Sequence, residues 1–105
     1  MLGETKFGAR SATLWPVARV TFTRNLERHV ACPSEDVPGA TLRAVLDAYF
    51  ERHPKVRGYV LDEQSELRRH VVLFVDGRQV AERKGFSQAL LDDSEVYVMQ
   101  ALSGG

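Results

Sequence analysis

The sequence has little of several features that mark large classes of protein. It contains one cysteine, Cys32, so no disulfide can form within the chain, and we expect a reducing compartment such as the cytoplasm. No apolar run approaches the length of a bilayer-spanning helix, and residues 1–16 lack the apolar stretch of a signal peptide. We therefore expect a cytoplasmic protein that does not bind membranes.

An excess of charge of either sign is also missing. Lys plus Arg and Asp plus Glu number 14 each, so the formal net charge is zero. A chain without a basic excess gains little from the release of counterions, which argues against nucleic acid as its main partner. What is present is 105 residues, 44% hydrophobic and 27% charged, the composition of one ordinary folded domain.

Groups of catalytic or metal-binding residues are scarce as well. His29 and Cys32 have the spacing of a pair of metal ligands, but two ligands do not fill a tetrahedral site, and neither His53 nor His70 pairs closely with them. Cys32 has no neighbouring base that would mark it as a nucleophile. We therefore expect no metal site, no bound cofactor and no intrinsic catalytic residue, which argues against an enzyme.

The first third of the chain predicts an extension followed by two strands. Residues 1–16 are rich in small and polar residues and are interpreted as a flexible extension. Apolar and polar residues alternate from Val17 onward, which is typical of a half-buried strand. After a turn, residues 29–32 are predicted as a second strand that stops at Pro33.

The clearest local pattern is that of a helix after Thr41, a residue suited to cap its first turn. We expect Pro54 to end this helix and residues 55–70, which are mostly charged, to form a long surface connection. The apolar residues of the helix fall on one face: Leu42, Val45, Leu46, Tyr49 and Phe50.

The last third predicts a hairpin and a final strand. Residues 71–75 form a β-branched apolar run, Asp76-Gly77 is a hairpin turn signal, and residues 78–81 form the return strand. Residues 87–91 suggest a helical turn, and residues 95–101 a last strand. The expected fold is α+β: a mixed sheet of four to five strands with one main helix across one face, and the first and last strands parallel in the centre.

Alternation along two of these strands predicts an apolar patch on the face of the sheet away from the helix. Exposed apolar area of this kind usually marks a binding site, so we expect a partner protein there. The alternative is that the extension or the charged connection covers this face. The patch would consist of Val72, Phe74, Tyr97 and Met99.

The last strand leads into Leu102, Ser103, Gly104 and Gly105. Two glycines lack Cβ atoms and can thread a channel too narrow for other side chains, which would deliver the α-carboxylate of Gly105 to an active site on another protein. The alternative is a frayed end.

This order of elements resembles the ubiquitin-like β-grasp proteins, and specifically the small bacterial sulfur carriers of the MoaD, ThiS and CysO type. The resemblance covers most of the chain, roughly residues 17–105, which is the span of the expected domain. Its most specific parts are residues 42–46 on the helix, residues 70–77 at the hairpin, and residues 93–96 with Gly104-Gly105. The charged connection and the sequence of the hairpin are most similar to CysO.

The resemblance implies that Gly105 is adenylated by a separate ubiquitin-activating-like enzyme of the MoeB/ThiF type, which uses ATP and its magnesium ion. Sulfur from a persulfide or sulfide donor would then displace AMP and leave a thiocarboxylate on Gly105, with Gly104, Ser103 and Leu102 threading the tail. A sulfur-accepting synthase would receive the sulfur, for molybdopterin, thiazole, cysteine or another product. The carrier would act as a monomer or in a heteromer with its partner.

Two other functions remain open from the sequence. A ubiquitin-like modifier would use the same activated tail to form an isopeptide bond with a lysine. A non-catalytic β-grasp interaction module would carry the Gly-Gly sequence incidentally.

Overall fold

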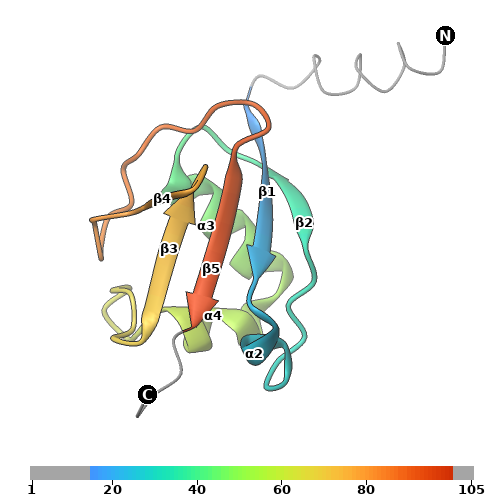
Figure 1. The fold of residues 1–105 in the computed structure, drawn as a ribbon, viewed down its shortest axis with the longest axis vertical. Coiled ribbons are helices and arrows are strands. Elements are labelled where there is room, and N and C mark those ends of the chain that lie inside the picture. Colours follow the sequence, from blue (N-terminus) through green and yellow to red (C-terminus); the bar gives the residue numbers. More distant parts are fainter. Residues whose placement is uncertain (1–14, 101–105) are drawn as a thin grey trace, which may run out of the picture.

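The computed structural model describes residues 15–100 and shows a five-stranded mixed sheet with its two longer helices on one side (Figure 1). The strand order is β2-β1-β5-β3-β4, so the predicted α+β β-grasp architecture is confirmed. The elements are, in chain order, β1 (Val17–Phe22), α2 (Arg24–Glu27), β2 (Glu35–Pro38), α3 (Leu42–Arg52), α4 (Pro54–Val60), β3 (Val71–Val75), β4 (Arg78–Gln79) and β5 (Glu95–Gln100).

The first and last strands lie side by side in the centre of the sheet, as predicted. β1 and β5 are parallel, with Arg19 opposite Glu95 and Phe22 opposite Val98, whereas the other strand pairs are antiparallel. A parallel pair requires a crossover connection. Here the connection passes through the helices behind the sheet, so one face is covered by helices and the other is not (Figure 1).

Helix α3 begins and packs as the sequence predicts. The Thr41 hydroxyl accepts a hydrogen bond from the backbone N–H of Ala44 at 3.2 Å, which satisfies one of the free donors of the first turn. The apolar face of the helix is buried against the sheet, with exposed fractions of 0 to 5% for Leu42, Val45, Leu46, Tyr49 and Phe50.

The hairpin between β3 and β4 turns at Asp76 and Gly77, whose φ angles are 52° and 84°. Both residues lie in the left-handed region, which glycine adopts freely and aspartate tolerates. The Asp76 carboxylate also accepts hydrogen bonds from the Glu95 backbone N–H at 2.8 Å and from the Ser94 hydroxyl at 3.1 Å. The hairpin is therefore tied to the start of β5, although β4 is shorter than the predicted strand at residues 78–81.

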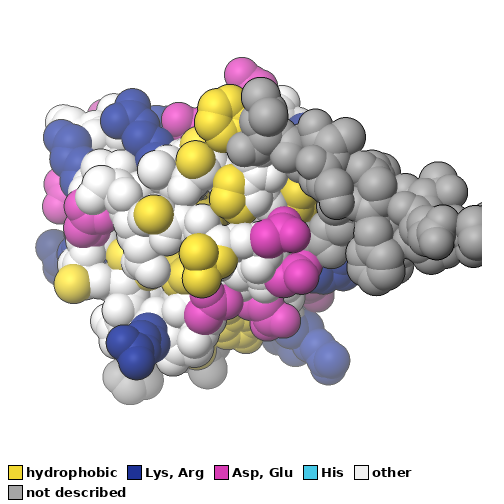
Figure 2. Space-filling view, turned by 90° about the horizontal axis from the view of Figure 1, so that it is seen from above, with side chains coloured by type: hydrophobic (Ala, Val, Ile, Leu, Met, Phe, Trp, Pro, Cys, Tyr) yellow, Lys and Arg dark blue, Asp and Glu magenta, His cyan; other side chains and the backbone are white. Residues whose placement is uncertain are grey.

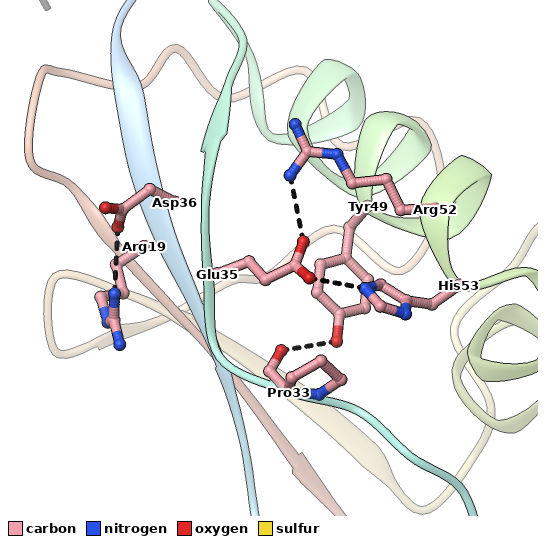
Figure 3. Close-up of polar contacts among 7 residues, drawn as sticks. All are labelled: Arg19, Pro33, Glu35, Asp36, Tyr49, Arg52 and His53. Atoms are coloured by element: carbon pink, nitrogen blue, oxygen red, sulfur yellow. Dashed lines mark hydrogen bonds and ion pairs between the residues drawn. The ribbon is translucent and has the colours of Figure 1, made fainter.

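The second strand was predicted at the wrong place. Residues 29–32 are not a strand, and β2 begins at Glu35, after Pro33. The carbonyl of Pro33 instead accepts a hydrogen bond from the Tyr49 hydroxyl at 2.7 Å (Figure 3). Because only Val37 of the four β2 residues is fully buried, this edge strand carries no alternating signal that a sequence pattern could reveal.

The charged connection at residues 55–70 was also interpreted wrongly in part. Pro54 ends α3 but occupies the first turn of α4, a position where a missing backbone N–H costs nothing. Val56 and Val60 are fully buried, and Leu61 and Leu67 are 5% and 3% exposed. The segment therefore contributes to the core, because its few apolar residues share one side of a short helix and the loop that follows it.

Residues 87–91 do not form the helical turn that the sequence suggested. The chain is extended there, and Thr41 forms an isolated bridge with Ala89. The Leu42 N–H donates to the Gln88 carbonyl and the Leu90 N–H donates to the Ala40 carbonyl, both at 2.9 Å. The segment does not close into a helical turn because it is hydrogen-bonded to residues 40–42 at the start of α3 instead.

The two faces of β2 carry different polar contacts (Figure 3). On the helix side, Glu35 bonds His53 at 2.8 Å and Arg52 at 3.0 Å, and its carboxylate pKa is lowered by the hydrogen bond from His53 and then by that from Arg52. On the other side, Asp36 pairs with Arg19 at 3.2 Å, with both side chains more than half exposed. Glu35 thus ties the end of α3 to the edge of the sheet.

Candidate functional site

The face of the sheet away from the helices carries the four residues predicted for the apolar patch. Val72 lies opposite Met99, and Phe74 lies opposite Tyr97, on the neighbouring strands β3 and β5. All four are half-buried, whereas the residues that alternate with them are at most 3% exposed: Val71, Leu73, Val75, Val96 and Val98. The alternation is confirmed, and we call these four residues the outer patch.

Helices α3 and α4 lie behind the sheet, so neither the helices nor the charged connection between α4 and β3 covers the outer patch (Figure 1). A hollow of about 290 Å³ lies beside the outer patch, toward the β3–β4 turn, with Thr21, Phe74, Gly77, Glu95, Val96 and Tyr97 lining it. Thr21 was not predicted as part of this surface. Its signal was available, because it alternates with the buried Val20 and Phe22 on β1.

The end of β5 is held from both sides. Gln100, the last described residue, lies opposite Val71 of β3. On the other side, the Gln100 N–H donates to the Thr23 hydroxyl at 3.2 Å, and the Asn25 side-chain amide donates to the Gln100 side-chain carbonyl at 3.5 Å. The chain therefore leaves the sheet from a fixed position, a role for Thr23 and Asn25 that no sequence pattern indicated.

The predicted tail residues Leu102, Ser103, Gly104 and Gly105 lie outside the described residues, as does the predicted extension apart from Trp15 and Pro16. Pro16 contacts the domain, because its carbonyl accepts a hydrogen bond from the Gly39 N–H at 2.9 Å. What the structure describes is the base from which the tail continues.

Cys32 is buried, and burial followed by the nearby charge of Glu27 raises the pKa of its thiol to about 11. A thiol with such a pKa is almost entirely protonated at neutral pH and is a poor nucleophile. Cys32 is therefore part of the core and not a reactive group.

Within residues 15–100, no three His, Cys, Asp or Glu side chains come together in a way that could hold a metal ion. In the same part of the chain, no helix has the length and apolar character needed to cross a membrane. The structure thus brings together one apolar surface, shared by β3 and β5, and the fixed end of β5.

Three solved structures have a fold similar to this one. SAMP1 from Haloferax volcanii superposes with a TM-score of 0.71 at 21% identity, covering 85% of this chain and 99% of that one. CysO from Mycobacterium tuberculosis has a TM-score of 0.67 at 24% identity, covering 81% of this chain and 99% of that one. A chain of the BexX/CysO complex from Amycolatopsis orientalis has a TM-score of 0.69 at 22% identity, covering 84% of this chain and 99% of that one.

These identities are low, so the solved structures establish the fold alone. A comparison with curated protein sequences found no match. The family is established by the sequence itself, because residues 24–105 match the ThiS family model, from the start of α2 to the second glycine of the tail. This protein belongs to the ThiS family.

Proposed function

We propose that this protein is a sulfur carrier whose Gly105 carboxylate is adenylated by a MoeB/ThiF-type enzyme and converted to a thiocarboxylate. The observation that carries the proposal is the course of β5. The strand contributes Tyr97 and Met99 to the outer patch and ends at the fixed Gln100, five residues before Gly105. One rigid strand thus joins a docking surface to the reactive end.

The outer patch has the composition of a docking surface. Aromatic residues and methionine are enriched in the buried parts of protein interfaces, and the patch has Phe74, Tyr97 and Met99. Five residues of extended chain reach at most about 18 Å. A partner that covers the outer patch can therefore receive the carboxylate in an active site a short distance beyond Gln100.

The chemistry is supplied by the partner. A carboxylate oxygen of Gly105 attacks the α-phosphorus of ATP, releases pyrophosphate and forms an acyl-adenylate. Hydrosulfide, or the terminal sulfur of a persulfide that is later cleaved by a thiol, attacks the carbonyl carbon, and AMP leaves. The thiocarboxylate sulfur is then passed to an acceptor on a synthase. ATP and magnesium belong to the activating enzyme, and the carrier is a protein cosubstrate.

The test is intact-mass analysis of the full chain after incubation with the MoeB/ThiF-type enzyme of the same organism, ATP, magnesium and sulfide. We expect the replacement of one oxygen by one sulfur in the wild-type chain and no change in a variant that lacks Gly105. Circular dichroism of both proteins controls for folding. An unmodified wild-type chain in the presence of an active enzyme would overturn the proposal.

A protein modifier is the second candidate, favoured by the likeness to SAMP1, which is named a small archaeal modifier protein. Such a protein would use the same adenylate but end in an isopeptide bond to lysine. Chain recovered from cells distinguishes the two functions. Higher-mass conjugates that disappear when Gly105 is deleted would identify a modifier, and a free chain with one sulfur would identify a carrier.

A further inference from the structure

Although the protein has no net charge, its charged residues differ between the two ends of the sheet, where β5 begins and where it ends. At the end where β1 and β5 begin, Asp36, Asp93 and Glu95 line one hollow with Arg19 and Val17. Figure 2 looks onto this end and shows acidic side chains gathered there. A net charge of zero therefore hides local differences in sign.

Basic side chains lie at the opposite end, where the chain leaves the sheet. Arg24 stands between Thr23 and Asn25, the two residues whose side chains bond Gln100. His70 directly precedes Val71, the strand partner of Gln100, so its Cα lies within about 9 Å of that of Gln100. Figure 1 shows α2 and the start of β3 on either side of the end of β5.

We call Arg24, Arg69 and His70 the exit collar. All three are exposed, and none forms an ion pair or side-chain hydrogen bond with another residue in the range 15–100. The neighbouring Arg68 and Arg83 are different, because Arg68 bonds the Gly58 carbonyl at 2.6 Å and Arg83 bonds the Arg68 carbonyl at 2.6 Å. The charges of Arg24 and Arg69 are thus not used to hold the fold.

Acidic residues also lie near the collar: exposed Glu27 is in α2 with Arg24, exposed Glu66 lies beside Arg69 and His70, and Asp62 is hydrogen-bonded within its own loop. Asp62 and Glu66 line the same pocket as Arg69 and His70. The Asp62 carboxylate accepts hydrogen bonds from the Glu66 and Gln64 backbone N–H groups at 3.0 and 2.8 Å. The bond from Glu66 lowers the Asp62 pKa most, and the bond from Gln64 and the charges of Arg68 and Lys84 lower it further. Asp62 is therefore committed to its own loop.

We propose that the exit collar binds acidic side chains around the mouth of the channel that receives the tail. This inference rests on the proposed function. Because the tail threads the channel, residues at its base meet the rim, and an acidic rim is the complement of two exposed arginines. Such contacts steer association and fix orientation. The outer patch would give contact area, and the collar would set the direction in which the tail points.

The experiment measures kcat/KM for ATP–pyrophosphate exchange by the MoeB/ThiF-type enzyme with the full chain as cosubstrate, from about 0.01 to 0.5 M salt. The variants Arg24→Glu and Arg69→Glu are compared with Arg78→Glu, an exposed arginine of β4 at the far end of the sheet. All three change the net charge equally. Thermal unfolding of each variant controls for stability.

We expect Arg24→Glu and Arg69→Glu each to lower kcat/KM by about three- to tenfold at low salt, through KM, with Arg78→Glu close to wild type. The difference should disappear at about 0.5 M, where the screening length is only a few ångströms. If the wild type is adenylated and all three variants have equal kcat/KM, the proposed role of the exit collar is wrong and the proposed function still holds. Failure to adenylate the wild type overturns both.

Discussion

The two faces of the sheet are built from the same strands but have different roles. Leu73 and Val98 on the inner face are fully buried under the helices, whereas their neighbours Val72 and Met99 on the outer face are only half-buried. The inner face fills space and is the main source of stability, because buried apolar area is removed from water. The outer face keeps apolar area available, which a stable fold does not require and a docking partner can use.

The largest expected effect is a difference in stability between variants on the two faces of the sheet. Leu73→Ala should lower the free energy of unfolding by about 2–5 kcal/mol, because it removes buried methyl groups and leaves a cavity. Val72→Ala, one residue away on the outer face, should cost less than about 1 kcal/mol. Urea unfolding with an unchanged m value measures both. Equal losses would show that the outer face is as important for the fold as the inner one.

The second prediction separates the faces by activity. Phe74→Asp and Met99→Asp should each lower kcat/KM for pyrophosphate exchange by about 30-fold or more, the effect of losing about 2 kcal/mol at an interface hot spot. The matched control is Ala44→Asp, on the exposed side of α3, where an acidic residue suits the start of a helix. Normal exchange with both outer-patch variants in a folded state would rule out the patch as the docking surface.

The smallest expected effect is a difference in the pH dependence of stability between the contacts on the two faces of β2. The pKa of Glu35 in the folded state is below its ordinary value of 4.5, so the unfolded state binds more protons in this range. The stabilisation by Glu35 is therefore complete above about pH 4.5 and is lost as the pH falls through the folded pKa.

We expect Glu35→Gln to remove part of the acid sensitivity, with an effect below about 1 kcal/mol because the pair is partly solvated. Asp36→Asn, in the exposed pair with Arg19 on the other face of β2, is measured beside it as the matched removal of one carboxylate. Urea midpoints from pH 7 to about pH 3 measure the difference. Identical pH profiles for wild type and Glu35→Gln would contradict this account of the contact.

Periodic segments could be predicted from the sequence, and segments fixed by single contacts could not. The apolar face of α3 repeats several times within its 11 residues, β3 is an apolar run that ends at a hairpin turn signal, and burial alternates along β3 and most of β5, so these elements and the outer patch could be predicted. β2 has only Val37 in the core, and the segment at residues 87–91 stays extended because of hydrogen bonds to α3. Such segments are determined by what they contact.

The sequence by itself determined which residues of β3 and β5 share a face, because side chains alternate along any strand, and it contains the two glycines on which the proposed function rests. Only the tertiary structure decided that Val72 meets Met99 and that Phe74 meets Tyr97, because strand register depends on the packing of the whole sheet. It also decided that Arg24 and His70, far apart in the chain, stand on either side of Gln100. That position follows from the central place of β5, whose end is reached by residues from both neighbouring segments.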